Sequence, residues 1–367
     1  MNFSEEPLTN SQIAELLAIT AEDAPAPLNK AYRRASRKAL LWPEEVSKLL
    51  QEDRALTELS GVGPYLNKII SRWMELSPAV AKPPDVRATF LTRTEARSIL
   101  RKHPSWASEV KGDLQMHTLW SDGSASIQQM AEAAETRGYE YIGITDHSKG
   151  LKIAGGINED QLAQQGNEIA AVNAAFEAAG RPIRVLRSIE VNLSPIGEVD
   201  MSVPSLNKLD LVLGCFHSSL RKKDDQTERY IAALRNPAIH ILGHPRGRIY
   251  NFRLGLSADW SRVFAVAAEL DKAIEIDCYP DRQDMSLDVI KLARKAGCRI
   301  SLGTDSHGVS QLEFIEFGMA AALKGKIDPE RILNFMGREA LVNWAKKKWS
   351  LRSAKTVSSI QTSLDRQ

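Results

Sequence analysis

The sequence predicts an α/β protein whose parallel strands close into a barrel, preceded by a small all-helical domain. From residue 111 onward, apolar runs such as YIGITDH (141–147) and CRISLGTDSH (298–307) alternate with helical stretches, which is typical of a parallel sheet. These runs end in an imidazole or a carboxylate, and α/β barrels gather functional side chains at the C-terminal ends of their strands. Helical periodicity in the first 76 residues predicts the preceding domain.

The composition is that of a globular protein with no strong bias toward one partner. A length of 367 residues favours two domains. The net charge is +2, so any nucleic acid must bind through a local basic patch. Three cysteines, an odd number, lie inside apolar runs and indicate reduced, buried thiols. Since no apolar stretch approaches the roughly 20 residues of a membrane span, we expect a soluble, cytoplasmic protein with no membrane partner.

Residues 1–77 are expected to form a succession of short helices. The first begins after an N-cap at Thr9 or Asn10. The second covers about 27–41, and Pro43 is expected to begin a third. A short fourth covers 53–59, and Pro64 begins the last, which runs to about residue 74.

The remaining chain divides into a linker, the barrel and a tail. Residues 78–110 are predicted to be a linker, because 77–92 are rich in Pro and Ala and lack helical periodicity. Residues 111–350 are the predicted barrel, with helices expected at 127–137, 160–179, 225–234, 260–272, 287–296 and 311–322. The polar segment 351–367 has no apolar face and is predicted to be disordered.

Two features of the helical domain favour DNA binding. LSGVGP (59–64) resembles the hairpin of a helix-hairpin-helix element, in which Gly61 and Gly63 would let backbone amides approach a phosphate. The alternative is a plain interhelical turn. The second feature is a basic helix with Lys30, Arg33, Arg34, Arg37 and Lys38. Like charges at such spacing are unfavourable unless an anion neutralises them, although a solvated basic face remains the alternative. Together these features predict contact with the DNA phosphate backbone without base reading.

Histidines and acids at the strand ends predict a metal site. The candidates are His117, Asp122, Asp146, His147, Glu190, His217, His244, Asp305 and His307. Imidazole nitrogens and carboxylate oxygens together suit Zn, Mn or Fe. We therefore expect a multinuclear metal site and a hydrolase. His103 and His240 do not fit the pattern and are interpreted as structural or surface residues.

Seven segments identify a resemblance to a known family. They are GDLQMHTLWSDG (112–123), TDHSKGLKIAGG (145–156), IEVN (189–192), CFHSS (215–219), GHPRGR (243–248), IEIDCYPDRQD (274–284) and GTDSH (303–307). In this order they resemble the polymerase-and-histidinol-phosphatase (PHP) domain, in the version found at the C-terminus of bacterial family X DNA polymerases. Residues 1–76 are similar to the N-terminal helical domain of those polymerases. Only about 30 residues take the place of their nucleotidyltransferase domain.

The resemblance implies a distorted (β/α)7 barrel that holds two or three Mn, Zn or Fe ions and hydrolyses phosphoesters. The implied ligands are Gln115, His117, Asp122, His147, Glu190, His217, His244, Asp305 and His307, with Glu190 bridging two ions. Gln115 stands where the broader family has histidine. The expected catalytic residues are Asp305, Asp146 and His217, with Asp305 or Asp146 accepting a proton from the attacking water.

Basic residues just beyond the strand ends are candidate phosphate ligands: Lys149, Lys152, Arg246, Arg248 and Arg282. Ordinary solvated loop charges are the alternative. The leading functional hypothesis is a phosphoesterase acting on DNA ends in repair, as a 3′–5′ exonuclease or 3′-end-processing enzyme, or on nucleotides. The alternatives are a small-molecule phosphatase of the histidinol-phosphate type and a catalytically inactive adaptor that binds DNA ends.

Overall fold

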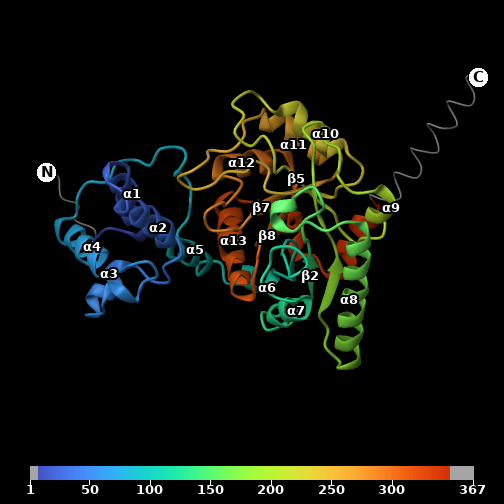
Figure 1. The fold of residues 1–367 in the computed structure, drawn as a ribbon, viewed down its shortest axis with the longest axis horizontal. Coiled ribbons are helices and arrows are strands. Elements are labelled where there is room, and N and C mark those ends of the chain that lie inside the picture. The colour runs from blue at the N-terminus through green and yellow to red at the C-terminus, as the bar shows by residue number, and fades with distance from the viewer. Residues whose placement is uncertain (1–6, 348–367) are drawn as a thin grey trace, which may run out of the picture.

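The computed structural model describes residues 7–347, so the predicted tail at 351–367 lies outside the described residues. A group of short helices near the N-terminus lies beside a larger α/β unit (Figure 1). Among residues 7–347 there is no helix with the length and apolar character needed to cross a bilayer.

The N-terminal helices form as the sequence predicts. α1 (Asn10–Asp23) begins after Thr9, whose side chain forms a reciprocal capping box with Gln12. It is followed by α2 (Leu28–Ala39), α3 (Val46–Gln51), the 3-10 turn η1 (Leu56–Glu58) and α4 (Pro64–Leu76). α3 starts three residues after Pro43, because Glu45 is still extended. These elements share one apolar core, which contains the fully buried Trp42.

The strands of the second unit form a closed ring. Their bounds are β1 (Gly112–Asp113), β2 (Tyr141–Ile144), β3 (Arg184–Arg187), β4 (Glu190–Asn192), β5 (Leu213–Cys215), β6 (Ile241–Leu242), β7 (Ala273–Asp277) and β8 (Arg299–Gly303). All pairings are parallel, in the orders β1-β2-β3 and β4-β5-β6-β7-β8. β3 and β4 are successive parts of one strand. Parallel bridges from His147 to Glu190 and from Met116 to Ser306 join the two sheets. Counting β3 and β4 together, the described residues form a seven-stranded barrel, as predicted.

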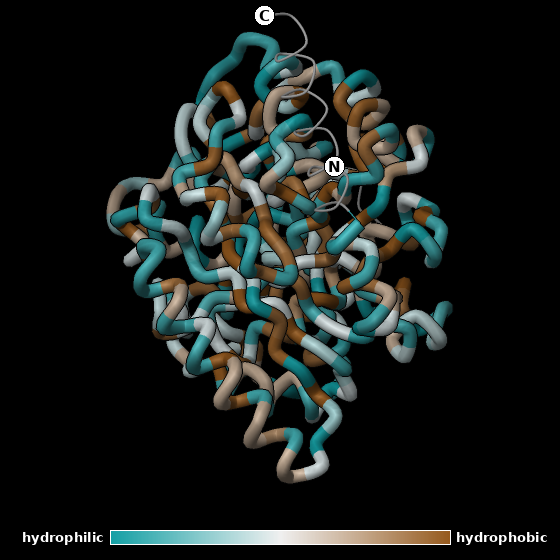
Figure 2. Tube along the Cα trace, turned by 90° about the vertical axis from the view of Figure 1, so that its right-hand side faces the viewer, coloured by the Kyte–Doolittle hydropathy of each residue, from teal (hydrophilic) through white to brown (hydrophobic). Residues whose placement is uncertain are grey.

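Helices cover the outside of the ring (Figure 1). They are α7 (Ile127–Glu135), α8 (Glu159–Ala178), α9 (Val203–Leu206), α10 (Thr227–Arg235), α11 (Trp260–Glu269), α12 (Leu287–Ala296) and α13 (Ile315–Lys324). Short 3-10 turns supplement them: η2 (Lys152–Ala154), η3 (Val309–Phe314), η4 (Pro329–Arg331) and η5 (Leu333–Phe335). Hydrophobic stretches run through the middle of the barrel and hydrophilic residues are common along its periphery (Figure 2). Because both faces of the strands are buried in such a barrel, their sequences are continuous apolar runs.

The structure corrects the predicted linker. Within 78–110, residues 93–109 form α5 (Arg93–Leu100) and α6 (Ser105–Glu109). Thr92 caps α5 in a reciprocal capping box with Glu95, a signal that the composition of the preceding segment obscured. α5 packs on α13. Arg93 pairs with Glu313 of η3 at 2.7 Å, and Arg97 pairs with Glu316 of α13 at 2.9 Å. Only residues 77–92 connect the two units without a regular helix.

The connecting segment ties the helical unit to the barrel. Arg87, whose side chain is 5% exposed, pairs with Glu15 of α1 at 2.8 Å, and its Nη1 donates to Asn251 of the β6–α11 loop at 2.9 Å. Tyr250 of that loop packs in the apolar core of the helical unit. The Tyr250 hydroxyl lies 3.0 Å from the Ser36 hydroxyl of α2. The two units therefore share buried contacts.

Candidate metal centre

The predicted ligands converge at the C-terminal ends of the barrel strands, from six of the seven strand positions and one loop. They are Gln115 and His117 after β1, Asp122 in the following loop, His147 after β2, Glu190 in β4, His217 after β5, His244 after β6, and Asp305 and His307 after β8. Parallel strands in a closed barrel direct these ends toward one mouth. Residues up to 192 positions apart in the chain thus meet at one site.

Glu190 is the centre of this cluster. Its Oε1 lies 2.8 Å from His217 Nε2 and 3.0 Å from His244 Nε2. Its Oε2 lies 3.4 Å from His117 Nε2 and accepts a hydrogen bond from Gln115 Nε2 at 3.0 Å. The Glu190 side chain is completely buried, so these groups replace water around its charge.

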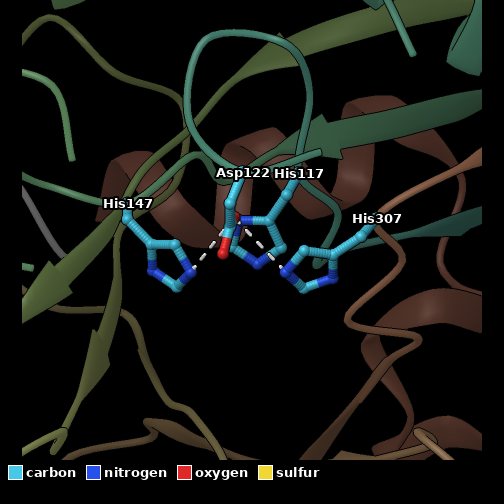
Figure 3. Close-up of side chains that lie close together, drawn as sticks. All are labelled: His117, Asp122, His147 and His307. Carbon is cyan, nitrogen blue, oxygen red and sulfur yellow. Dashed lines mark ion pairs between the residues drawn. The ribbon is translucent and has the colours of Figure 1, made fainter. Parts of the chain in front are cut away.

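A second group surrounds Asp122. Its Oδ1 lies 3.3 Å from His307 Nε2 and 3.6 Å from His147 Nε2. The His117 ring stacks on those of His147 and His307, at centroid separations of 4.3 and 4.5 Å. Figure 3 shows these four side chains pointing toward one another from different segments.

The donors fit more than one metal ion. Four overlapping groups of ligand atoms each lie within 4.8 Å of one another. Glu190 belongs to three of them, together with His147 and His217, with Cys215 and His244, and with His117 and Asp305. One carboxylate shared by several nitrogen-rich groups is the geometry that a bridging ligand requires, and the donor set suits divalent transition metals.

Buried donor atoms without partners support the same conclusion. His117 Nδ1, His147 Nδ1 and Gln115 Oε1 are buried and have no hydrogen-bond partner in the described residues. Leaving such atoms unsatisfied is costly. Coordination would satisfy the His147 nitrogen, which lies 3.8 Å from Glu190 Oε1. Gln115 faces Glu190 with its amide nitrogen and not with its oxygen.

The backbone at two ligands is held in an uncommon conformation. His244 has φ +22 and Asp305 has φ +52, in the left-handed region, which non-glycine residues adopt at a cost and often at functional sites. Neighbouring bonds maintain both. The His244 amide donates to Glu275 Oε2 at 2.8 Å, and His307 Nδ1 lies 2.7 Å from the Asp305 carbonyl oxygen.

Charge compensation sets the protonation of the centre. Burial alone would raise the pKa of Glu190, but His147, His117, His217 and His244 hold it well below its ordinary value. Burial and the nearby His117 lower the pKa of His147 to about 3. Burial opposes the charged form of His244 as well, yet its hydrogen bond to Glu190 raises its pKa to about 9.

Two polar residues at the centre, Asn192 and Cys215, were not among the sequence candidates for it. Asn192 Oδ1 lies 2.5 Å from His217 Nδ1 and orients that ring. Cys215, set aside as a buried thiol, lies with Glu190 and His244. Burial and the neighbouring carboxylates hold its pKa well above the usual value, which keeps the thiol protonated. Asn192 lies two residues after Glu190 on β4. Because side chains two residues apart share a face of a strand, this spacing could have predicted that Asn192 lies near the centre.

Asp146, a predicted proton acceptor, lies outside the cluster. Its Oδ1 accepts from the Thr118 amide at 2.7 Å and from Ser121 Oγ at 2.5 Å. Its Oδ2 accepts from Thr118 Oγ1 at 2.6 Å and from Gln165 Nε2 at 2.7 Å. Its oxygens are therefore occupied in bracing the loop after β1, and it is corrected from a catalytic to a supporting residue.

The five candidate phosphate ligands differ in position and in the contacts that they make. Arg282 contacts Asp305 and lies 3.8 Å from Asp277, and it lines a cleft together with His307. Lys149 pairs with Glu159 at 2.8 Å, and Lys152 is exposed.

Arg246 and Arg248 are bound elsewhere, contrary to the prediction. Arg246 Nη1 donates to Ser286 Oγ at 3.0 Å. Arg248 is 4% exposed, lies over the Phe90 ring at 3.8 Å and donates to the Ala88 carbonyl. It holds the connecting segment, and its burial lowers its pKa to about 10. Long side chains near a strand end can turn away from the mouth, which local sequence does not reveal.

The candidate DNA contacts divide between two surfaces. Lys30, Arg33, Arg34, Arg37 and Lys38 are all exposed on α2. Arg33 and Arg37 line the cleft that contains Arg282 and His307, whereas Arg34 lines a separate groove with residues 57–66. In that groove Gly61 has φ +84, which favours glycine, and a Cβ at Gly63 would meet nothing within 4 Å.

His103 and His240 stay outside the centre. His103 is exposed. His240 is fully buried, and its Nδ1 accepts a hydrogen bond from the Val212 amide at 3.1 Å. Both therefore have the structural or surface positions that the sequence predicts.

Comparisons with known proteins agree with this geometry. The chain is 36% identical over 227 residues to the DNA polymerase/3'-5' exonuclease PolX of Bacillus subtilis (strain 168), which covers 62% of this chain and 39% of that protein. It is 27% identical over 237 residues to the probable phosphatase YcdX of Escherichia coli (strain K12), covering 62% of this chain and 91% of that protein. The chain thus spans about two fifths of the polymerase and most of the phosphatase.

A solved structure of histidinol phosphate phosphatase from Lactococcus lactis, complexed with zinc, L-histidinol and phosphate, aligns with 60% of this chain and 95% of that chain. The TM-score is 0.42 and the sequence identity 17%. The family model described as the PHP domain matches residues 113–297, which include most of the ligands described above. The chain belongs to the PHP domain family and is a metal-dependent hydrolase of phosphoesters.

Proposed function

We propose that the protein hydrolyses phosphodiester bonds at DNA ends, as a 3′–5′ exonuclease or 3′-end-processing enzyme. The observation that carries this proposal is the cleft of about 530 Å³ beside the metal centre. It is lined by His307 and Arg282 of the barrel and by Arg33 and Arg37 of α2. Three guanidinium groups beside a phosphoesterase centre favour a substrate that carries several phosphates.

The similarity to the Bacillus subtilis polymerase and exonuclease supports the same substrate class. The shared region covers 39% of that protein, so assigning its exonuclease activity to this chain is part of the proposal. The exposed basic face of α2 is also what non-specific phosphate contacts require.

The chain's own residues have distinct roles in the proposed reaction. Divalent ions, Mn, Zn or Fe, would activate a water molecule and polarise the phosphoryl group. Glu190 would bridge two of them, while Asn192 keeps His217 oriented toward Glu190. Asp305 is the remaining candidate to accept the proton, because Asp146 lies outside the cluster. Arg282, in contact with Asp305, is placed to hold a phosphoryl oxygen.

A small-molecule phosphatase is the second candidate. The similarity to the Escherichia coli probable phosphatase, which extends over 91% of that protein, favours it. In this case the helical unit would serve as a scaffold. The adaptor hypothesis predicts DNA binding without hydrolysis.

Hydrolysis of defined substrates by the manganese-loaded protein distinguishes these candidates. We expect a 5′-labelled single strand to be shortened from its 3′ end, and histidinol phosphate to be a poor substrate. His217→Ala should lower the rate more than about 100-fold, because it removes a ligand whose supporting contacts alone are worth about 10- to 100-fold. His103→Ala is the matched control, since it removes an exposed histidine outside the centre. An intact oligonucleotide beside a hydrolysed small ester would contradict the DNA proposal.

A further inference from the structure

An exposed aromatic ring lies in the cleft beside the metal centre. Phe252 lines this cleft and is 62% exposed. Burial of such a side chain would be favourable, although single exposed hydrophobic residues are common. Exposure alone therefore does not identify a binding surface, and the contacts of the turn that carries the ring decide its role.

The turn around Phe252 is held on both sides. Ile249 and Arg253 form an antiparallel bridge, and the Phe252 amide donates to the Ile249 carbonyl at 3.1 Å. The preceding Tyr250 is 3% exposed in the core of the helical unit. These contacts keep the ring at the cleft. The Arg221 guanidinium lies 5.2 Å from the ring centroid, and most of the side chain nevertheless stays exposed.

The same turn is tied to the helix that carries the basic residues. Tyr250 contacts Ser36 at 3.0 Å between the hydroxyl oxygens. Ser36 lies between Arg33 and Arg37 on α2, and these two arginines line the cleft with Phe252. The ring and both guanidinium groups are thus positioned relative to one another by a buried contact.

The charge in the cleft favours an anion. Arg33, Arg37 and Arg282 line it together with one acid, Asp281. Burial raises the pKa of Asp281, and the nearby Arg282 and Arg37 oppose that shift. Three guanidinium groups therefore outnumber one carboxyl group in the lining of the cleft. Arg282 contacts Asp305 at the metal centre and is the guanidinium assigned to the scissile phosphoryl group, so Arg33 and Arg37 are the ones left for a neighbouring phosphate.

We propose that this cleft is a nucleotide subsite for single-stranded nucleic acid. Phe252 stacks on the base next to the scissile phosphodiester, and Arg33 and Arg37 bind the following phosphate. The proposal rests on the proposed phosphodiesterase function and specifies its substrate. Stacking on an aromatic ring combined with cationic phosphate contacts is typical of single-strand binding, because a duplex hides the faces of its bases. The preferred substrate is therefore a single strand of two or more nucleotides.

Steady-state kinetics on labelled oligothymidylate test the subsite. Phe252→Ala should raise KM by about 5- to 100-fold, as loss of one stacked base predicts, and leave kcat within about twofold. Phe252→Leu keeps apolar volume without a π face, so it should raise KM as well and guards against misfolding of the alanine variant. Arg33→Gln/Arg37→Gln should also raise KM and reduce the slope of log KM against log salt by about 1.4, from two lost phosphate contacts to a single strand.

The matched control is Lys68→Gln/Arg72→Gln, which removes two exposed charges at the same spacing from α4, outside the cleft. It should leave KM and the salt slope unchanged. Equal KM values for the wild type and the cleft variants, or equal KM for single and double strands, would overturn the subsite. If the wild type cleaves no oligonucleotide, the proposed function fails, and fluorescence anisotropy of the labelled strand decides the subsite alone. Equal affinity of the wild type and the cleft variants would then overturn it.

Discussion

At the residue scale, the metal centre contains opposing charges that an ion must rearrange. Glu190 is ionised because the surrounding imidazoles outweigh the effect of its burial. The hydrogen bond between His244 and Glu190 raises the pKa of His244 to about 9, although burial favours its neutral form. A metal ion binds the neutral imidazole, so it must displace a proton from His244.

The pH dependence follows from this proton. We expect the affinity for Mn to rise between pH 6.5 and about 9, as His244 loses its proton more readily. The chelated protein should behave in the opposite way. Because the pKa of His244 is raised on folding, its contribution to stability is fully present below pH 6.5 and is lost as the pH rises through about 9.

Manganese titrations and thermal unfolding in chelator, each over this pH range, measure the two effects. In His244→Gln the decline in stability of the chelated protein with pH should be smaller than in the wild type. A metal affinity that falls as the pH rises would contradict the protonated state of His244.

At the scale of elements, the strands are short and the loops beyond them hold the ligands. β1 contains only two residues by its ladder bonds, yet His117 and Asp122 follow it. Asp146 fixes this region, since its four hydrogen bonds join residues 118 and 121 to Gln165 of α8. A loop with this many bonds to one buried carboxylate depends on that residue for its conformation.

Replacing Asp146 should therefore disturb both stability and the centre. We expect Asp146→Ala to lower the free energy of unfolding by about 1.5–3 kcal/mol, the range for bonds to a charged group, and to weaken metal binding through displacement of His117. Denaturant unfolding and metal titration provide the measurements. Asp160→Ala, at an exposed acid in the first turn of α8, should cost no more than about 1 kcal/mol. Normal metal affinity in Asp146→Ala would show that the loop does not need this brace.

At the scale of the whole molecule, buried contacts of the connecting segment join the helical unit to the barrel. Arg87 pairs with Glu15 and Glu22 of α1 at 2.8 and 2.7 Å and also reaches Asn251. Glu15 is 3% exposed. Removing one member of a buried pair leaves the other charge without compensation.

We expect Arg87→Ala to destabilise the protein by about 3–5 kcal/mol and to make the connecting segment more sensitive to protease. The control is Arg54→Ala, which removes an arginine from the same unit whose ion pairs with Glu44, Glu52 and Glu58 are partly exposed. Its effect on stability should be much smaller, because water screens exposed ion pairs. Calorimetry and limited proteolysis compare the two variants, and equal melting temperatures would contradict the structural role of Arg87.

Prediction from the sequence succeeded where the pattern is local and regular. The N-cap was predicted at Thr9 or Asn10, and the structure has it at Thr9. The predicted start of α4 at Pro64 and the bounds of α12 at residues 287–296 also agree with the structure. It was wrong for residues 93–109, because a preceding stretch rich in Pro and Ala masked the capping box at Thr92. Irregular composition marks the start of a connection better than its end.

The ligand set and the barrel were determined by the sequence itself. Every candidate ligand except Asp122, which lies in a loop, stands within or just after an apolar run, and the ends of parallel strands meet when the barrel closes. Only the tertiary structure decided which charges belong to the centre. Arg282 faces the cleft, whereas Arg248 is buried against Phe90, and Arg33 and Arg37 join the cleft because α2 is fixed to the loop at Tyr250. A long basic side chain has the same local pattern whether it pairs, packs or faces a substrate, so its role depends on contacts distant in the chain.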